Sequence, residues 1–430
     1  MKKLLYFFNK NKILFKNFFW RSSQTLLKSV LSISILLISL SYLTSVEYGI
    51  ITYISSIMML FIIVCDFGIS ASASKYTAEY SALQSDNEKK VFGSASVIII
   101  ILATISSLFI IIFGSKLFHN YYKYILVLIP NLYITPFISL LDGIYRGKKK
   151  FKDLFFRNIY ACGFAIGISF ILIMKYKLFG AVLSVAAIQF IYLIGLLFSA
   201  PISTRGFNSD VMRKIAKYAM YIGIANVSYF MYTRIDILIM EKFGYMVEIG
   251  YYGIIDNIFN FILMPSIILG QTIAPDASRW SSMKEYNKLR EKFRLSAIYG
   301  LPLSIVTAIL IYIFFIVILN QWGSKYNDES FIQILKILSF LLPLKIWGSF
   351  TANAFITPSG YAKILSVLTF LGGLSNIILD LVLIKYYGFV GVFLATLIVH
   401  SICISLSNFI YFKKLNIRSK ELKNDRKTLL

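Results

Sequence analysis

The chain has 430 residues, of which 58% are hydrophobic and only 15% are charged. An ordinary soluble domain carries about 25% charged residues, so this composition excludes a soluble protein and predicts an integral membrane protein. The net charge of +24 would suit a nucleic-acid-binding protein. The basic residues lie mainly between apolar runs, however, so we attribute the charge to membrane topology and expect no nucleic-acid partner.

Apolar runs of the length that crosses a membrane, about 20 residues, recur along the whole chain. We therefore predict an all-α integral membrane fold with about twelve transmembrane helices. The approximate spans are 22–43, 48–70, 92–114, 121–143, 154–174, 178–200, 218–240, 251–273, 295–320, 331–357, 363–384 and 388–412. Pro130 and Pro136 predict a kink in the fourth span, because proline removes a backbone hydrogen bond.

The distribution of lysine and arginine predicts the orientation in the membrane. Most of the 44 basic residues lie in the N-terminal segment, the C-terminal segment and the loops on the same side as these. Cytoplasmic loops are enriched in lysine and arginine, so both termini are predicted to be cytoplasmic. Residues 1–20 are interpreted as an uncleaved basic amphipathic leader on the membrane surface, and residues 413–430 as a basic cytoplasmic tail.

Two sets of six spans define the expected domains. The N-terminal six-helix bundle covers 21–200, the C-terminal bundle covers 218–412, and the polar, turn-rich segment 201–217 is the cytoplasmic linker. The polar loop 71–91 is expected to carry a short surface helix.

The second half of the chain repeats motifs of the first half. Tyr48-Gly-Ile-Ile and Ala73-Ser-Lys-Tyr76 recur as Tyr252-Gly-Ile-Ile and Ala277-Ser-Arg-Trp280, each 204 positions later. The stretch 175–183 before the sixth span resembles 386–394 before the twelfth, at an offset of 211. Six is an even number of spans, so the two bundles are predicted to be parallel in orientation. A parallel repeat places the working site near the interface between the halves.

Catalytic and metal-binding patterns are missing from the sequence. The two histidines are far apart, the three cysteines lie in different spans, and no Gly-rich phosphate loop occurs. We expect no enzyme activity, no cofactor and no metal site.

Charged residues inside the spans are the candidate functional residues, because a charge within the bilayer costs several kcal/mol. In the seventh span, Asn226 shares a helix face with Arg234, whereas Asp236 points elsewhere. In the eighth span, Asp256 and Asn260 form a polar face at a similar depth. An interhelical pair of Arg234 and Asp256 is predicted. It has two interpretations: a structural ion pair, or an anion-binding arginine held by a carboxylate.

Further charged residues lie in other spans. Lys345, near the middle of the tenth span, is expected to face a cavity, because it lies too deep to reach the interface. His400, in the twelfth span, is interpreted as a packing residue, with titration near neutral pH as the alternative. Asp66, Asp142 and Asp380 lie near span ends and are expected to be solvated.

The assembled pattern resembles the polysaccharide-transporter branch of the multidrug/oligosaccharidyl-lipid/polysaccharide exporter superfamily, and within it the O-antigen flippases. The matching motifs extend over nearly the whole chain: Tyr48-Gly, Asp66-Phe-Gly68, Tyr145-Arg-Gly147, Arg234-Ile-Asp236, Tyr251-Tyr-Gly253, Ser375-Asn376 and Tyr387-Gly-Phe-Val-Gly391. The resemblance implies two six-helix bundles around a central cavity. It also implies that this cavity opens alternately to the two sides and moves an undecaprenyl-diphosphate-linked oligosaccharide across the bacterial inner membrane, for O-antigen or capsule-type polysaccharide assembly.

With this substrate, the expected roles fall into two sets. Substrate binding is assigned to Arg234, Lys345, Asn226 and Asn260, and ion coupling or pairing to Asp256, Asp236 and His400. The expected partners are the lipid-linked oligosaccharide, membrane lipids and a polysaccharide polymerase complex, and the chain is expected to function as a monomer.

Two alternatives remain open. The first is a cation-coupled, multidrug-type exporter of small organic cations, which would favour an anionic cavity. The second is a scaffold that anchors a polymerase complex, which charged residues at matching depths disfavour.

Overall fold

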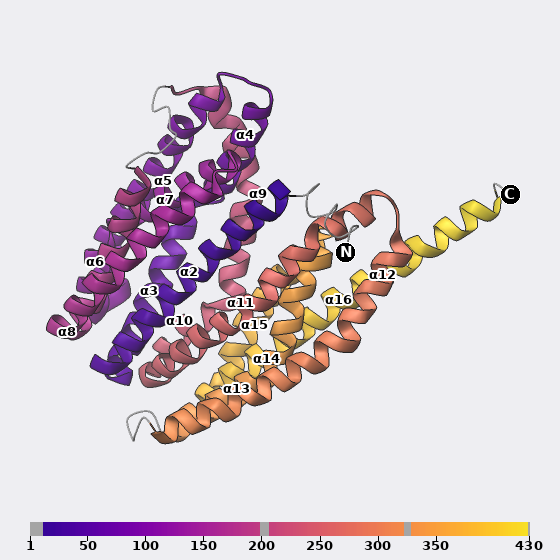
Figure 1. Ribbon diagram of the computed structural model, residues 1–430. Coiled ribbons are helices and arrows are strands. Elements are labelled where there is room, and N and C mark those ends of the chain that lie inside the picture. The colour runs from indigo at the N-terminus through magenta and orange to yellow at the C-terminus, as the bar shows by residue number, and fades with distance from the viewer. Residues whose placement is uncertain (1–11, 198–205, 322–327, 429–430) are drawn as a thin grey trace. The chain divides into compact units, whose positions relative to one another are not determined.

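The computed structural model describes residues 12–197, 206–321 and 328–428 (Figure 1). Within these ranges the chain forms helices and no strands. Its contacts divide it into two units, Met1–Val227 and Ser228–Leu430, so the boundary falls inside a helix.

The first unit begins with the predicted leader, of which residues 1–11 lie outside the described residues. Its helices are α2 (Lys12–Tyr42), α3 (Ser45–Asp66), α4 (Ile69–Ala82), α5 (Glu88–Phe118), η1 (His119–Tyr121), α6 (Tyr122–Leu128), α7 (Asn131–Gly147), α8 (Phe151–Leu197) and most of α9 (Ser209–Thr233). Helix α2 runs unbroken from the leader into the first span. Helix α4 overlaps the loop 71–91, where a short helix was expected, but it packs against α7 and α5.

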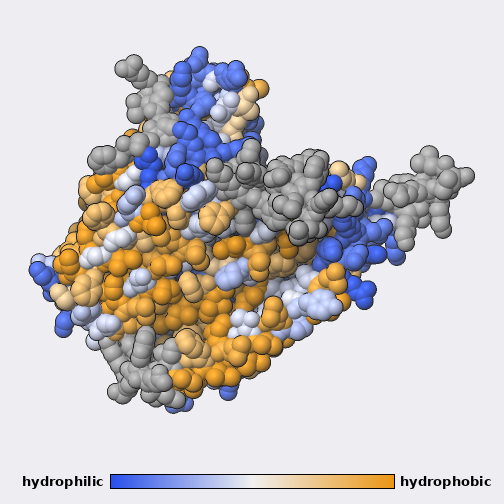
Figure 2. Space-filling model, viewed as in Figure 1, coloured by the Kyte–Doolittle hydropathy of each residue, from blue (hydrophilic) through white to orange (hydrophobic). Residues whose placement is uncertain are grey.

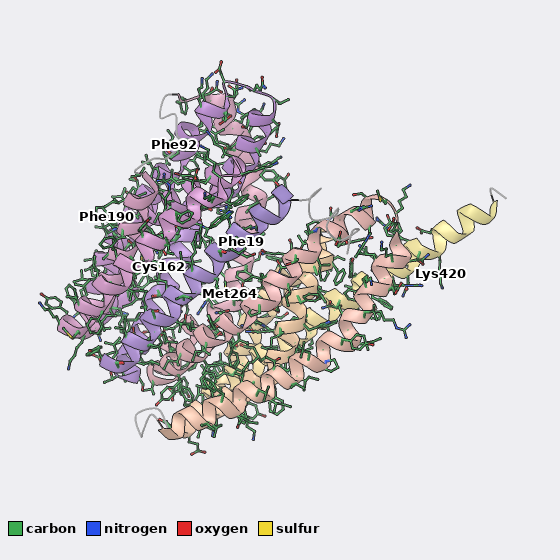
Figure 3. All side chains as sticks on the ribbon, viewed as in Figure 1. Phe19, Phe92, Cys162, Phe190, Met264 and Lys420 are labelled. Carbon is green, nitrogen blue, oxygen red and sulfur yellow. The ribbon has the colours of Figure 1, made fainter. Side chains whose placement is uncertain are left out.

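The second unit contains the end of α9 and the remaining helices. These are α10 (Ile235–Lys242), α11 (Met246–Ser282), α12 (Tyr286–Leu295), the π-helix η2 (Ser296–Gly300), α13 (Leu301–Gln321), α14 (Glu329–Thr351), the π-helix η3 (Ala352–Ile356), α15 (Ala362–Tyr387) and α16 (Phe389–Thr428). The predicted tail continues α16, and Figure 3 shows Lys420 on this extension.

Nine helical stretches of the described chain are long and apolar enough to cross a membrane. One of them, α8, contains the non-helical residue Lys177 and so corresponds to two predicted spans. The predicted fourth and seventh spans are each divided between two helices, α6 with α7 and α9 with α10. Within the described residues, each of the twelve predicted spans is therefore helical, and the predicted all-α membrane fold is confirmed.

The outward-facing residues suit a lipid environment. Large apolar side chains are exposed on α5 and α13 in particular, among them Ile105, Ile112, Leu303, Leu310 and Phe314. Figure 2 shows apolar residues covering the sides of the helices, with hydrophilic residues gathered toward their ends. Without a membrane, this much exposed apolar surface would be rare in a monomer.

Each unit has its own core. In the first unit, α2, α7 and α8 enclose Leu31, Leu141, Cys162 and Ala165, and Figure 3 marks Cys162 on α8. In the second unit, Phe293 packs against Trp347, Phe355 and Tyr411.

The internal repeat is visible in the turns that join paired spans. Lys177 and Gly388, 211 positions apart, both have positive φ angles, 48° and 58°. Three residues after each of them, Gly180 and Gly391 approach a backbone carbonyl so closely that no side chain would fit. The same backbone turn is thus built twice.

The helix bounds add detail to two predictions about the middle of the chain, the linker 201–217 and the seventh span. Helix α9 begins at Ser209, so much of the predicted linker 201–217 is helical, while residues 201–205 lie outside the described residues. The predicted seventh span is not one continuous helix, because it breaks at Arg234.

Candidate functional site

The candidate site is built around the helix break at Arg234. This residue has φ −140° and ψ −9°, so it ends the run of α9 and stands at the N-cap of α10. Its backbone nitrogen still donates to the carbonyl of Phe230, 2.8 Å away. Within a membrane such a break is tolerated only where neighbouring groups satisfy the freed backbone, and discontinuous helices often mark the substrate sites of transporters.

The predicted pair of Arg234 and Asp256 is confirmed. Arg234 Nη2 lies 2.7 Å from Asp256 Oδ2, and Asn260 Nδ2 donates to the same oxygen at 3.0 Å. Asp256 and Asn260 lie one turn apart on α11, so both face the arginine side. The Arg234 and Asp256 side chains are 25% and 13% exposed, and Asn260 is exposed. The pair is accessible from the surface of the second unit.

Lys345 belongs to the same charged group. It lies on α14, which packs against α11, and its side chain is partly buried. Its ammonium group interacts electrostatically with Asp256, Asp236 and Arg234. Two cations and two carboxylates thus come together from three helices of one unit.

Asp236 has a structural role at the helix break. It is 1% exposed, and its Oδ1 accepts a hydrogen bond from the backbone nitrogen of Ile237 at 2.9 Å. The Tyr252 hydroxyl donates a second hydrogen bond to it. A carboxylate in the first turn of α10 is also favoured by the helix dipole. Asp236 therefore holds α10 in place beside the Arg234–Asp256 pair.

Asp380 was expected to be solvated at the end of a span, and this expectation is wrong. The residue is 0% exposed and lies about two turns inside α15, which continues to Tyr387. Asn376 Nδ2 donates to its Oδ2 at 3.2 Å, and Asp380 also interacts electrostatically with Asp236. Asp380 Oδ1 and Asn376 Oδ1 have no hydrogen-bond partner among the described residues.

His400 supports the helix break from α16. Its ring stacks on Tyr232 at 3.9 Å with an 8° interplanar angle, and its Nε2 lies 2.9 Å from the Tyr232 carbonyl. The last carbonyls of a helix have no partner within the helix. Since the acceptor is a carbonyl, the Nε2 atom carries the proton. The geometry favours the packing interpretation of His400.

The expected role of Asn226 beside this group stays a prediction. It lies on the part of α9 that belongs to the first unit, is partly buried, and has no side-chain hydrogen bond within the described residues. Of the residues predicted from the sequence, Arg234, Asp236, Asp256, Asn260, Lys345 and His400 are gathered in the second unit. Sequence reasoning missed Asn376, Tyr252 and Tyr232, and it misjudged Asp380. No capping pattern marks the helix break, because Arg234 is the N-cap of α10 without a side-chain cap bond and Thr233 Oγ1 donates to the Tyr229 carbonyl of α9 at 2.8 Å.

The aspartates in the spans of the first unit form local contacts and no comparable charged group among the described residues. Asp142 is buried, not solvated as expected, and Lys28 Nζ lies 3.2 Å from its Oδ2. Asp66 accepts hydrogen bonds from the backbone nitrogens of Gly68 and Ser70, at 3.3 Å and 3.2 Å, and so caps α4. Among the described residues, no three His, Cys, Asp or Glu side chains are placed to hold a metal ion.

Sequence comparison relates this chain to one family. The family model described as "Polysaccharide biosynthesis protein" matches residues 14–275, more than half of the chain. An uncharacterized membrane protein of Methanocaldococcus jannaschii is 28% identical over 281 residues, which is 61% of this chain and 65% of that protein.

Structural comparison shows the fold. An inward-facing multidrug resistance MATE family transporter of the MOP superfamily aligns with a TM-score of 0.77 at 14% identity, covering 92% of this chain and 96% of that one. A MATE multidrug transporter solved in complex with a ligand gives 0.68 at 17% identity, covering 95% and 96%. A MOP superfamily transporter from Pyrococcus furiosus, described as having a binding pocket of reverse polarity, gives 0.66 at 13% identity, with the same coverage.

Proposed function

Because the chain belongs to the polysaccharide biosynthesis protein family and has the fold of MOP superfamily transporters, we propose that it is a flippase for an undecaprenyl-diphosphate-linked oligosaccharide. It would move this lipid across the bacterial inner membrane by alternating access, for O-antigen or capsule-type polysaccharide assembly. The observation that carries the proposal is the accessible Arg234–Asp256 pair with Lys345 beside it.

The physical task of such a flippase is to move a diphosphate through a low-dielectric layer. An isolated charge in an apolar medium is prohibitively unfavourable, and fixed cations offset that cost. Arg234 suits the task because its planar guanidinium binds two phosphate oxygens at once, whereas Lys345 acts as a point charge.

Asp256 gives the site two states. In one state, the one seen here, it neutralises Arg234 at 2.7 Å, so this cation is paired. An arriving diphosphate competes for the guanidinium and displaces the carboxylate, which remains hydrogen-bonded to Asn260. This exchange limits the affinity for the substrate, and it allows release when the carboxylate returns.

One observation favours the second candidate, a cation-coupled exporter of small organic cations. Asp236 and Asp256 interact with the cations Arg234 and Lys345, and Asp380 interacts in turn with Asp236, so among the described residues this group holds three carboxylates and two cations. If all five are ionised, the group is net negative, which would attract a cationic substrate. The two functions therefore predict opposite ligand preferences for the purified protein.

A binding experiment separates them. The full-length protein in detergent is titrated with undecaprenyl diphosphate and, separately, with tetraphenylphosphonium, and tryptophan fluorescence reports binding. Saturable binding of the diphosphate that Arg234→Ala abolishes supports the flippase. Binding of only the organic cation, retained in Arg234→Ala and lost in Asp256→Asn, would establish the exporter instead.

The cellular experiment tests the activity. In cells that lack the native protein, Arg234→Ala combined with Lys345→Ala is expected to abolish surface polysaccharide at equal membrane abundance, with partial rescue by Arg234→Lys. The matched controls are Arg279→Ala on α11 and Lys336→Ala on α14, both exposed cations outside the charged group. Normal surface polymer in the double variant would contradict the proposal.

The same proposal places both termini in the cytoplasm. A cysteine at Asn120 should then react with an impermeant thiol reagent in cells with a permeabilised outer membrane, and one at Asn287 should not. Labelling at Asn287 would reverse the orientation. A partnership with a polysaccharide polymerase complex and function as a monomer remain part of the proposal.

A further inference from the structure

A groove in the second unit lies apart from the charged group. It encloses about 340 Å³, within the range of roughly 300–1,000 Å³ typical of ligand pockets. Its walls come from α12, η2, α14 and α16, and its lining residues are mostly apolar: Phe293, Arg294, Ala297, Trp347, Ser405, Asn408, Phe409 and Phe412.

The groove has fixed walls. The π-helix η2 begins at Ser296, and Trp347 Nε1 donates to the Ser296 carbonyl at 3.1 Å. Phe293 is 4% exposed and packs against Trp347 and Phe412, with ring centroids 6.3 Å and 6.1 Å apart. Single π-turns in α-helices frequently mark functional sites, because the extra residue displaces the backbone.

Two polar residues in the groove are available to a ligand. Asn408 is 4% exposed and its Nδ2 donates to the Ile404 carbonyl at 2.8 Å, but its Oδ1 has no hydrogen-bond partner among the described residues. Arg294 is exposed and forms no ion pair with any residue that the structure describes. The groove thus offers one cation at its rim and one buried acceptor within.

The surroundings point to a lipid. Ile298, Leu406 and Phe409, which flank or line the groove, are 49%, 41% and 63% exposed, as expected of side chains that face acyl chains. Helix α12 adds Arg290 and Lys292, so the end of the groove at α12 is basic. Basic pockets between transmembrane helices attract anionic lipid headgroups.

We propose that this groove binds an anionic phospholipid with hydroxyl groups in its headgroup, of the phosphatidylglycerol type. One acyl chain lies along the aromatic wall of Phe293, Trp347 and Phe409. The phosphate pairs with Arg294, and a headgroup hydroxyl donates to Asn408 Oδ1. This site is independent of the proposed transport substrate.

Trp347 makes the proposal directly testable, because bromine atoms on an acyl chain quench tryptophan at short range. The full-length protein keeps Trp347 as its single tryptophan, with Trp20, Trp280 and Trp322 replaced by phenylalanine. Brominated phosphatidylglycerol is expected to quench its fluorescence saturably. Brominated phosphatidylcholine, which has no net charge, should require about five-fold more lipid, since one basic residue near a lipid surface contributes about 1 kcal/mol.

Three variants in this background decide the outcome. Arg294→Gln should remove the preference for phosphatidylglycerol, whereas the charge-matched control Lys336→Gln, an exposed cation of α14 outside the groove lining and away from α12, should keep it. Ala297→Leu fills the groove and should reduce quenching by both lipids. Equal quenching by the two lipids in the parent protein, or an unchanged preference in Arg294→Gln, would overturn the proposal. If Ala297→Leu does not fold, the Arg294 comparison decides alone.

Discussion

The two copies of the repeated hairpin have diverged in their backbone. The first copy is two helices, α3 and α4, because the chain turns at Phe67 and Gly68, which have φ angles of 35° and 81°. The second copy is a single helix, α11, which continues through Pro265 and Pro275 to Ser282. The repeated motif therefore does not preserve helix continuity.

The copies also differ in the chemistry on their matching faces. At the offset of 204, Thr52 and Ser56 in α3 correspond to Asp256 and Asn260 in α11. The two hydroxyls bond to carbonyls of their own helix, at 2.9 Å and 2.8 Å. Asp256 instead binds Arg234, on another element. The repeat sets the fold, and the candidate site is placed on one copy only.

The largest expected effect on stability comes from removing Asp256, the charged residue that the first copy lacks. Asp256→Ala leaves Arg234 without its partner, and removing one member of a buried ion pair costs about 3–5 kcal/mol. Because the pair is partly exposed, we expect a loss of about 3 kcal/mol in the free energy of unfolding. Thr52→Ala, at the equivalent position, should change it by at most about 0.5 kcal/mol.

Chemical denaturation of both variants in mixed micelles measures the contrast. Equal losses in the two variants would mean that the copies carry the same energetic role. A double-mutant cycle with Arg234→Ala isolates the contribution of the pair.

The second prediction concerns packing in the first unit. A Cβ atom on Gly143 of α7 would lie 2.5 Å from the Ser70 carbonyl of α4, so these helices touch through their backbones. Gly143→Val should therefore destabilise the protein by about 2 kcal/mol through overpacking. The control is Gly167→Val on α8, where nothing lies within 4 Å. Thermal unfolding in detergent measures both, and a loss of similar size in the control would contradict the explanation.

Much of this fold was predictable because membrane spans follow from hydropathy alone. The Arg234–Asp256 pair was predictable as well, since two opposite charges at similar depth in neighbouring spans stabilise each other within the bilayer. The position of the break was not predicted. Residues 218–240 contain no proline, and their only glycine, Gly223, lies well before Arg234, so hydropathy shows one continuous span.

The burial of polar side chains within the bundle is the second feature that the sequence did not predict. Asp380 was placed near a span end because apolarity falls after residue 384, but α15 continues to Tyr387 and Asp380 is fully buried. Hydropathy reports the length of an apolar run. It does not report which face of a helix meets another helix. Asn376 lies one turn before Asp380 on the same helix, whereas Asp236 reaches Asp380 from α10 through tertiary packing.

A third prediction compares the last span of each half, at one pair of equivalent residues. His400 and Gln189 are equivalent at the offset of 211, but only His400 bonds a helix-end carbonyl, that of Tyr232. His400→Ala should cost about 1–2 kcal/mol, because a buried carbonyl loses its donor. Gln189→Ala, partly buried, should cost less than about 0.5 kcal/mol. Denaturation midpoints of the two variants provide the test, and a larger loss for Gln189→Ala would refute this assignment.

The smallest expected effect separates the two capping aspartates. Asp66 precedes the turn before α4 and accepts backbone N–H bonds at the start of that helix. Asp236 follows the break at Arg234 and accepts a backbone N–H bond at the start of α10. Asp66→Ala removes the acceptor of the Gly68 and Ser70 backbone bonds, so it should cost about 1 kcal/mol, the usual value of a helix cap.

Asparagine separates capping from charge at these two positions, because its side-chain oxygen still accepts the backbone bonds. Asp66→Asn should therefore restore nearly all of the stability lost in Asp66→Ala. Asp236→Asn should keep α10 capped yet remove one negative charge beside Arg234, with which Asp236 interacts electrostatically. Surface polysaccharide should then change in Asp236→Asn and stay normal in Asp66→Asn, at matched protein abundance. If both asparagine variants behave alike in stability and in polymer export, the charge at Asp236 has no role in transport, and the difference between the two units is confined to Arg234, Asp256 and Lys345.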